Sequence, residues 1–328
     1  MADLLEVEDL EVTFAGEAQA VRLDRVSFSV RQKEILCIVG ESGCGKSITS
    51  LAVMGLLPVN GGVTNGRVLF EGRDLLQLSE KELDTVRGSE MTMIFQDALT
   101  SLNPVFTIGS QLTESIRAHT QIDRKHAQAQ AVSLLEKVGL QDAPALMKKY
   151  PFALSGGMRQ RVMIAMALAC SPKLLIADEP TTALDVTIQA QIMQLLKRLQ
   201  RETNMSVVLI THDIGLVAQM ADRVLVMYAG QIVEQAPVPE LFHHPAHPYT
   251  QALLQTVPGI HDEPGRRLAS IPGSVPEAYQ NITGCRFAGR CPYAQEACAA
   301  PQPMYRVTAE HAARCLRCAP EKGGEADG

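Results

Sequence analysis

The sequence predicts an α/β fold with a largely parallel β-sheet. Apolar runs that suit buried strands alternate with helical patterns along most of the chain, and this alternation is typical of strands joined by crossover helices. A glycine-rich loop follows the run 34–39, and an acidic pair ends the run 174–178. The expected strands of the sheet are residues 34–39, 91–95, 174–178, 206–210 and 223–227. The expected helices cover residues 47–56, parts of 107–138, 156–169 and 187–201.

The first thirty residues have a different pattern. Residues 4–14 and 22–30 alternate apolar and polar side chains. This alternation predicts strands with one face buried, in contrast to the continuous apolar run at 34–39, which predicts a strand covered on both faces.

Composition limits the function classes. A chain of 328 residues with 46% hydrophobic residues can bury one large α/β core and carry a smaller appendage. The net charge is −6 and no long basic run is present, which argues against general nucleic-acid binding. The start of the chain has no signal-peptide pattern, and no apolar stretch is long enough to cross a bilayer. We therefore expect a cytoplasmic protein whose membrane role, if it has one, comes through a partner.

The segment Gly40–Ser47 matches the phosphate-loop pattern G-x-x-x-x-G-K-[ST] between a predicted strand and a predicted helix. Its glycines allow backbone N–H groups to surround a β-phosphate, and the helix directs its positive end at the phosphates. Lys46 is expected to reach the β- and γ-phosphates, and Ser47 to bind Mg²⁺. Cys44 occupies a variable position and is interpreted as a small packed side chain.

Polar residues end three other predicted strands. Asp178 and Glu179 follow the apolar run Leu174–Ala177. Asp178 is expected to hold Mg²⁺ through water, and Glu179 to act as the general base for the attacking water. His212 is placed to reach a γ-phosphate, and Gln96 to offer an amide oxygen to Mg²⁺. Taken alone, His212 is more readily interpreted as an ordinary loop histidine, and a single glutamine is no evidence for a Mg²⁺ site.

The string Ser155-Gly156-Gly157 opens the predicted helix 156–169 and provides a second anion site that has no lysine. One chain cannot easily bring this turn and the phosphate loop to the same phosphate. The pair therefore predicts a dimer in which each chain completes the site of the other.

This ordered set resembles the nucleotide-binding subunits of ABC transporters over about residues 4–245. Gly40–Ser47 resembles the Walker A loop, Gln96 the Q-loop, Leu154–Gln160 the signature motif and Leu174–Glu179 the Walker B motif. Residues 183–185 resemble the D-loop and His212 the switch histidine. Met158 departs from the glutamine that the family usually has.

The resemblance implies a P-loop ABC cassette over residues 1–257, with a RecA-like core, an antiparallel β subdomain and a helical subdomain at about 98–170. It implies ATP and Mg²⁺ as cofactors. Phe14 would stack on adenine, although a strand-core role is the alternative. Glu179 and His212 would be catalytic, and Ser47, Gln96 and Asp178 would bind Mg²⁺. The implied ATP-binding residues are Phe14, Gly40, Ser42, Gly43, Cys44, Gly45, Lys46, Ser47, Ile48, Gln96, Ser155, Gly156, Gly157, Asp178 and Asp185.

Longer strings, among them residues 91–109 and the His247–Thr250 tetrapeptide, resemble the ATPase subunits of dipeptide and oligopeptide importers. This narrower resemblance implies a peripheral protein on the cytoplasmic face of the membrane. The implied partners are a second ATPase subunit (a related chain or a second copy), two permease subunits and a solute-binding protein. Import of nickel or another small solute is an alternative. A soluble ABC ATPase that acts on ribosomes or DNA is disfavoured, because the chain has one motif set and no coiled-coil insertion.

Five of the eight cysteines lie in the last 44 residues, after a Pro- and Gly-rich boundary near residue 258. In a cytoplasmic protein this crowding favours metal or cluster ligation over disulfides. The wide spacing favours a [4Fe–4S] cluster over zinc, with several free cysteines as a third possibility. The family resemblance implies that Cys285, Cys291, Cys298 and Cys315 hold the cluster and that Cys318 is spare. Residues 258–320 are expected to form this extension, and 321–328 a disordered tail.

Overall fold

The computed structural model describes residues 3–16, 20–96, 101–182, 184–256 and 270–320. Within these ranges the predicted strands and helices are present, and the α/β prediction is confirmed. The strands are β1 (Leu5–Phe14), β2 (Ala20–Val30), β3 (Ile35–Val39), β4 (Gly61–Phe70), β5 (Arg73–Asp74), β6 (Met91–Ile94), β7 (Leu174–Asp178), β8 (Ser206–Thr211), β9 (Arg223–Tyr228), β10 (Gln231–Pro237), β11 (Tyr305–Arg306) and β12 (Ala312–Ala313).

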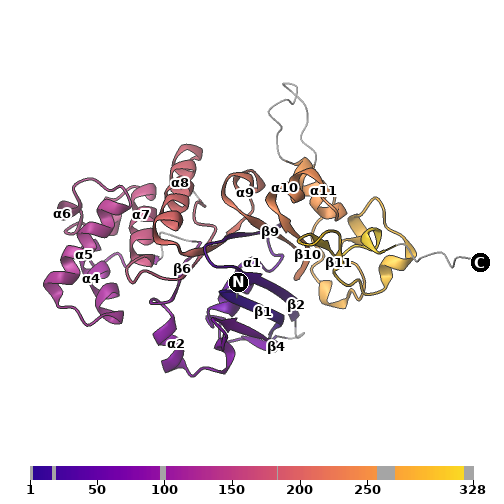
Figure 1. Cartoon of the computed structure of the whole chain (residues 1–328), viewed down its shortest axis with the longest axis horizontal. Helices are drawn as coiled ribbons and strands as arrows, with labels where there is room; N and C mark the ends of the chain where they lie inside the picture. The colour runs from indigo at the N-terminus through magenta and orange to yellow at the C-terminus, as the bar shows by residue number, and fades with distance from the viewer. Residues whose placement is uncertain (1–2, 17–19, 97–100, 183, 257–269, 321–328) are drawn as a thin grey trace, which may run out of the picture.

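Helices cover the sheet and form a separate group at one end of the molecule (Figure 1). The α-helices are α1 (Lys46–Val53), α2 (Glu80–Val86), α4 (Ile108–His119), α5 (Arg124–Lys137), α6 (Ala143–Leu146), α7 (Gly156–Ala167), α8 (Val186–Thr203), α9 (Ile214–Met220), α10 (Val238–His243) and α11 (Pro248–Gln255). The short 3-10 turns are Leu75–Gln77, Pro151–Ala153, Tyr279–Asn281, Ala288–Arg290, Glu296–Ala299 and Leu316–Cys318.

The main sheet has the strand order β11-β12-β10-β9-β3-β8-β7-β6. Its β9, β3, β8, β7 and β6 are parallel, and β10, β12 and β11 pair antiparallel at one edge. Parallel strands place their carboxyl ends along one edge, where ligands bind in open α/β sheets. The loop after β3 and the polar residues after β6, β7 and β8 therefore meet at that edge.

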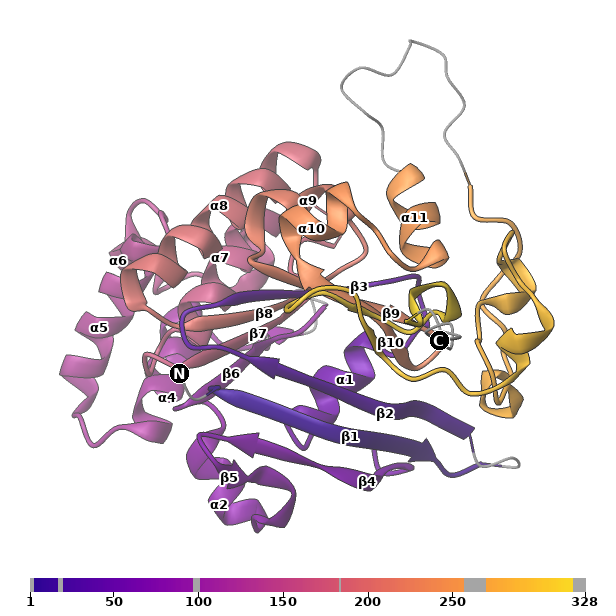
Figure 2. The same ribbon diagram turned by 45° about the vertical axis from the view of Figure 1, so that its right-hand side comes forward.

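A second, four-stranded antiparallel sheet has the order β2-β1-β4-β5. It lies beside the main sheet, with α1 between them (Figure 2). The sequence pattern predicted β1 and β2 as half-buried strands, and β1 alternates buried with less buried positions as expected. β4 and β5, which complete this sheet, were not predicted.

Two hydrophobic clusters cover the two faces of the main sheet. Successive residues of β3 point to opposite faces, so Cys37 and Val39 join the cluster beneath the helices, while Leu36 and Ile38 join the cluster beneath the second sheet. All five residues of β3 are buried. Full burial of one such aliphatic side chain stabilises the fold by about 1.5–3 kcal/mol. The strand that leads into the phosphate loop is therefore fixed from both sides.

The C-terminal segment lies at the end of the molecule opposite α4, α5 and α6 (Figure 1). It contains short 3-10 turns and the two-residue strands β11 and β12. β12 pairs with β10 through Glu234–Ala313 and Gln235–Ala312, so this segment extends the main sheet. No helix in the described ranges has both the length and the apolar character needed to cross a membrane. The expected disordered tail, 321–328, lies outside the described residues.

Candidate nucleotide-binding site

The phosphate loop joins β3 to α1, as the sequence predicts. Gly45 is the N-cap of α1 with φ 108°, a conformation that L side chains rarely adopt. A Cβ on Gly40 would lie 2.2 Å from the carbonyl oxygen of Met227 on β9. Gly45 is thus required by its backbone conformation and Gly40 by its close fit against β9, while Ser42 and Gly43 are exposed.

Lys46 lies inside the curve of the loop. Its side chain is buried and its Nζ donates hydrogen bonds to the carbonyl oxygens of Gly40 (2.9 Å) and Glu41 (3.0 Å). Cys44 is fully buried, and burial raises the pKa of its thiol. Its position agrees with a packed side chain. Ile48 is partly buried and packs against the cluster beneath the second sheet.

Asp178 ends β7 next to the phosphate loop. The residue is 4% exposed, and its Oδ1 is buried without a hydrogen-bond partner among the described residues. Burial raises the pKa of Asp178, and a hydrogen bond with the Ser47 side chain opposes that shift. An orphaned carboxylate oxygen beside a serine hydroxyl is the donor set that Mg²⁺ takes together with phosphate oxygens. The residues present therefore fit the metal that the motif implies.

The Glu179 carboxylate, which follows β7, interacts with polar side chains that follow β6 and β8 and with one from its own loop. Its Oε2 accepts hydrogen bonds from Gln96 Nε2 (3.2 Å) and Thr182 Oγ1 (3.0 Å), and its Oε1 lies 3.3 Å from His212 Nδ1. The backbone of Glu179 has φ 45°, which is uncommon for a residue with a side chain, and its N–H donates to Ile210 on β8. The structure thus brings together the glutamine, glutamate and histidine that the sequence predicted.

Thr182 was missed by the sequence reasoning. It lies three residues after Glu179 in a turn closed by the Thr182 N–H and the Glu179 carbonyl oxygen. That turn returns the threonine hydroxyl to the glutamate side chain. The sequence feature that could have indicated Thr182 is a hydroxyl residue three positions after the glutamate. Many solvent-exposed threonines have the same spacing from an acidic residue, so the feature is not specific.

The Ser155-Gly156-Gly157 turn opens α7, with Ser155 as N-cap accepting from the N–H of Met158. Ser155 and Gly156 are exposed. A Cβ on Gly157 would lie 2.8 Å from Ile188 Cγ2 on α8, so this glycine also permits close helix packing. Across the described residues, no hydrogen bond joins this turn to the phosphate loop.

Two more predicted residues lie at element ends. Asp185 is the N-cap of α8 and accepts from the N–H of Ile188 (2.9 Å). Phe14 ends β1, is partly buried, and its ring covers Gly61, where a Cβ would lie 2.9 Å from the ring. Packing against Gly61 agrees with the alternative that Phe14 is a strand-core residue. Ala183, in the predicted D-loop, lies outside the described residues.

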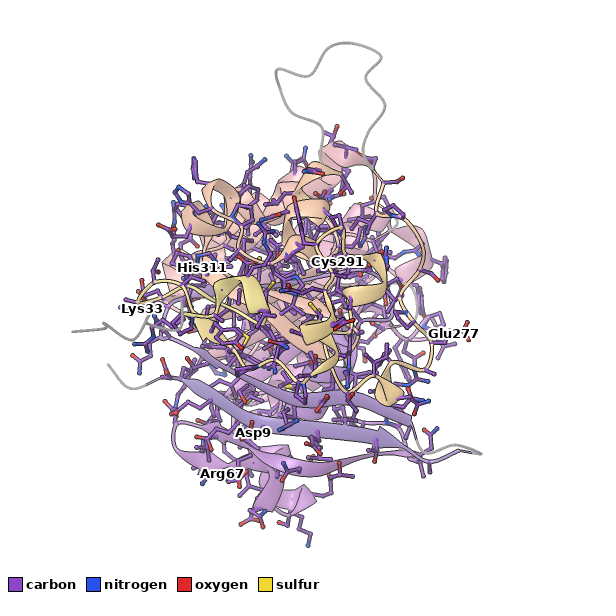
Figure 3. The ribbon with its side chains drawn as sticks, turned by 90° about the vertical axis from the view of Figure 1, so that its right-hand side faces the viewer. Asp9, Lys33, Arg67, Glu277, Cys291 and His311 are labelled. Atoms are coloured by element: carbon purple, nitrogen blue, oxygen red, sulfur yellow. The ribbon has the colours of Figure 1, made fainter. Side chains whose placement is uncertain are left out.

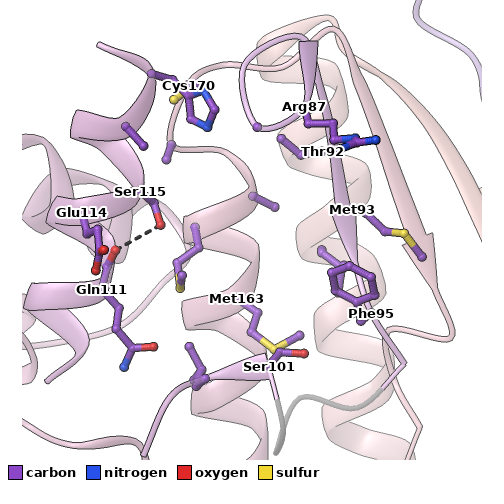
Figure 4. Close-up of a pocket in the computed structure, with 18 of the residues that line it drawn as sticks. Arg87, Thr92, Met93, Phe95, Ser101, Gln111, Glu114, Ser115, Met163 and Cys170 are labelled. Carbon is purple, nitrogen blue, oxygen red and sulfur yellow. Dashed lines mark hydrogen bonds between the residues drawn. The ribbon is translucent and has the colours of Figure 1, made fainter. Parts of the chain in front are cut away.

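A cavity of about 660 Å³ separates β6 from the helices α4 and α7 (Figure 4). Its lining is mixed, with apolar side chains such as Phe95, Phe106 and Met163 beside polar ones such as Gln111 and Glu114. Phe95 and Phe106 are 42% and 51% exposed. Phe95 directly precedes Gln96, whose side chain donates a hydrogen bond to Glu179.

The cysteine segment faces the viewer in Figure 3. Cys285, Cys291, Cys298 and Cys315 line one small cavity of about 20 Å³, and Cys318 is not among its lining residues. Burial raises the pKa of Cys285 to about 11, whereas a hydrogen bond with Cys318 lowers the pKa of Cys315 to about 6. Within the described ranges, no group of three or more His, Cys, Asp or Glu residues is arranged to hold a metal ion. The predicted cluster and its zinc alternative are therefore not supported.

Comparison with known proteins identifies the family to which the chain is similar. Residues 23–182 match the "ABC transporter" family model, and residues 233–298 match "Oligopeptide/dipeptide transporter, C-terminal region". The chain is 51% identical over 308 residues to the dipeptide transport ATP-binding protein DppD of Escherichia coli, with 94% of each chain covered. It is 50% identical to the oligopeptide transport ATP-binding protein AppD of Bacillus subtilis, with 97% of each chain covered.

Solved structures agree on the fold. The ATP-binding cassette MJ0796, solved as a dimer in a post-hydrolysis state with ADP and Pi, superposes with a TM-score of 0.64 at 28% identity. The match covers 71% of this chain and 98% of that one. The cassette fold, the ordered motifs and the extensive identity lead to one conclusion: this chain belongs to the ATP-binding subunits of ABC transporters, in the dipeptide/oligopeptide importer family.

Proposed function

We propose that this protein is the ATP-hydrolysing subunit of an ABC importer that takes up dipeptides or oligopeptides. The observation that carries the proposal is the Glu179 carboxylate, held by Gln96, Thr182 and His212 at the carboxyl ends of β6, β7 and β8. A carboxylate positioned beside the phosphate loop is suited to accept a proton from an attacking water. The peptide substrate is inferred from the relatives, because the permease and binding protein select the solute.

Each residue has a proposed role in one ATP site. The loop of Lys46 cradles the β- and γ-phosphates, Ser47 and Asp178 hold Mg²⁺, and Phe14 borders the adenine. Glu179 takes the proton from water, and His212 holds the γ-phosphate. Mg²⁺, when bound, neutralises phosphate charge.

We infer that the exposed Ser155–Gly157 turn binds the γ-phosphate of a second ATPase subunit, with Asp185 near that interface. The support is geometric: no hydrogen bond among the described residues joins the turn to the phosphate loop of its own chain, and its N–H groups point from a helix N-terminus. The second subunit is either another copy or a related chain.

The proposed membrane partner is a pair of permease subunits, bound on the cytoplasmic side of the membrane. The cavity beside β6 (Figure 4) offers them a surface of mixed polarity that includes the exposed rings of Phe95 and Phe106, and Phe95 directly precedes Gln96 in the sequence. A force on Gln96 from that side reaches Glu179 through one hydrogen bond. A solute-binding protein outside the membrane would deliver the peptide.

The proposed domain division is a cassette over 1–257, with a helical subdomain at about 98–170, and a C-terminal extension over 258–320. A [4Fe–4S] cluster on Cys285, Cys291, Cys298 and Cys315 stays a proposal that rests on the shared cavity of these thiols. A cavity of about 20 Å³ holds about one water molecule, so a cluster requires it to widen. A bound cluster would crosslink the extension. Iron and sulfide analysis after anaerobic purification tests this; a colourless protein with one zinc per chain would contradict it.

The test of the main proposal is reconstitution of the full chain with its permease subunits and binding protein in liposomes. We expect ATP-dependent uptake of labelled dipeptides or oligopeptides, with ATP hydrolysis stimulated by the loaded binding protein. Uptake of nickel without peptide uptake would favour the small-solute alternative. ATP hydrolysis without any association with permease subunits would favour a soluble ATPase.

A further inference from the structure

Glu41, the second residue of the phosphate loop, is held from outside the loop by the C-terminal third of the chain. This position is variable in the phosphate-loop pattern, so the motif gives it no role. Two groups contact it in the structure: the guanidinium of Arg290 and the hydroxyl of Tyr249. In the sequence, Arg290 lies 249 residues and Tyr249 lies 208 residues from Glu41.

Arg290 forms a two-bonded ion pair with Glu41. Its Nη1 donates to Glu41 Oε2 at 2.7 Å and its Nη2 donates to Oε1 at 3.0 Å. The Arg290 side chain is only 7% exposed, and Glu41 is 28% exposed. A bidentate pair fixes direction as well as distance, and its burial protects it from screening by salt.

The same guanidinium is fixed on its other sides. Nε donates to the carbonyl oxygen of Pro272 (2.7 Å), and Nη2 also donates to those of Gly273 (3.2 Å) and Ile271 (3.3 Å). Nη1 lies 3.3 Å from the Tyr228 hydroxyl on β9. Arg290 therefore has little freedom to follow Glu41 if the loop moves, and acts as a fixed point.

Tyr249 holds the backbone of the same residue. The Glu41 N–H donates to Tyr249 Oη at 2.9 Å. The tyrosine ring packs with Tyr228 at a centroid distance of 4.7 Å and with Phe287 at 5.4 Å, and Tyr249 is fully buried. His247, the N-cap of α11, accepts from the Tyr249 N–H. This packing explains why the His247–Thr250 tetrapeptide lies against the phosphate loop.

Inside the loop, the Glu41 carbonyl oxygen accepts from Lys46 Nζ at 3.0 Å. One residue therefore joins the external contacts to the lysine that is proposed to bind the phosphates. A loop that is ordered before ATP arrives loses less entropy on binding, so contacts of this kind strengthen nucleotide affinity.

We propose that Arg290 is a positioning residue for ATP binding, which holds Glu41 and thereby the phosphate loop in its binding conformation. The inference rests on the proposed ATPase function and adds a residue from the C-terminal region to it. Arg290 acts on nucleotide affinity and leaves the chemical step to Glu179 and His212, which follow β7 and β8. Loss of the Arg290–Glu41 ion pair should therefore change the KM for ATP and leave kcat nearly unchanged.

The experiment compares Arg290→Met, Glu41→Gln and the double variant with the parent chain, all full-length and bound to the permease subunits. We expect Arg290→Met to raise the KM for ATP about fivefold while kcat stays within about twofold. Glu41→Gln should have a similar effect, and the double variant should be no worse than either single variant. Arg290→Lys, which keeps the charge but cannot bind through two parallel N–H groups, should recover only part of the affinity.

Arg306→Met is the matched control, because Arg306 is an exposed arginine on β11 in the same C-terminal segment. Its KM and kcat should equal those of the parent. A lowered melting temperature with unchanged KM for Arg290→Met would overturn the proposal and make Arg290 a structural anchor, as would additive effects in the double variant. If Arg290→Met does not fold, Arg290→Lys and Glu41→Gln decide the outcome by the same KM criterion. A parent complex without ATP hydrolysis would instead reject the proposed function.

Discussion

The phosphate loop and the Ser155–Gly157 turn both place helix N-termini where an anion can bind, yet their surroundings differ. The loop lies between β3 and α1 with Lys46 buried, and Tyr249 and Arg290 hold it from outside. Ser155 in the turn is exposed, and its hydroxyl accepts a hydrogen bond from the N–H of Met158 in its own helix. The difference supports the proposal that the chain supplies the phosphate loop of its own ATP site and offers the exposed turn to the ATP site of another subunit.

The largest expected effect comes from substituting Glu179, which lies at the same sheet edge as the phosphate loop. Glu179→Gln removes the proposed base but keeps the size of the side chain, so hydrolysis should fall at least about 100-fold. ATP binding should persist, and an ATP-bound dimer should accumulate, as measured by light scattering with Mg²⁺ and ATP. Glu136→Gln, at an exposed position of α5, is the control. Hydrolysis by Glu179→Gln at the parental rate would show that the base is another group.

The next prediction distinguishes the role of the Ser155–Gly157 turn from that of the phosphate loop. Ser155→Arg places a bulky cation in the exposed turn and should reduce ATP hydrolysis about tenfold or more, because it blocks the second subunit. Binding of a fluorescent ATP analogue to the isolated chain should stay within about twofold of the parent, since its own loop is intact. Lys46→Ala should lose both binding and hydrolysis. Equal loss of binding in both variants would contradict this distinction.

The burial of Asp178 predicts how the stability of the folded protein depends on pH. Its pKa is raised by burial, so the folded state binds this proton more tightly than the unfolded chain does. Stability from this group is full at low pH and is lost as pH rises through its folded pKa. Without Mg²⁺, Asp178→Asn should therefore raise the melting temperature at pH 7.5 by about 2 °C.

The difference should shrink as the pH is lowered toward 5, where more of the parental carboxylate is protonated. Mg²⁺ with ATP should reverse the order, because only the parent can offer a carboxylate to the metal. A variant that is less stable than the parent at pH 7.5 in EDTA would contradict the account.

The smallest effect concerns packing behind the exposed turn. Gly157→Ala brings a Cβ to 2.8 Å from Ile188 Cγ2, and the isoleucine must shift. We expect a loss of about 1 kcal/mol in the free energy of unfolding, measured by urea denaturation. Gly62→Ala is the control, since no atom lies within 4 Å of its Cβ position. Equal stability of both variants would show that Ile188 adapts without cost.

The sequence predicted the parts of the fold that depend on a local pattern. Continuous apolar runs predicted the strands β3, β7 and β8. The phosphate-loop pattern after the first run and the acidic pair at the end of the second identified Lys46 and Glu179. Gln96 and His212 were predicted to share that site because parallel strands end at one edge, and the structure places both beside Glu179.

What could not be predicted depends on pairing between distant segments. β12 has two residues and exists because β10 is beside it, and β4 is largely polar on its exposed face. Arg290 lies among several arginines of the C-terminal segment, and only tertiary packing directs it toward Glu41. Periodicity contains no information about such a contact.

The pairing of β12 with β10 bears on how the chain can be divided. The composition changes near residue 258, which suggests a cut there, but the backbone of β10 pairs with residues 312–313. A chain ended at residue 257 would leave β10 as an open edge strand and uncover Tyr228 and Tyr249, whose aromatic partner is Phe287. Open edges and bare aromatic surfaces promote aggregation. Residues 270–320 therefore cover one edge of the sheet, and a chain without them would be prone to associate with copies of itself.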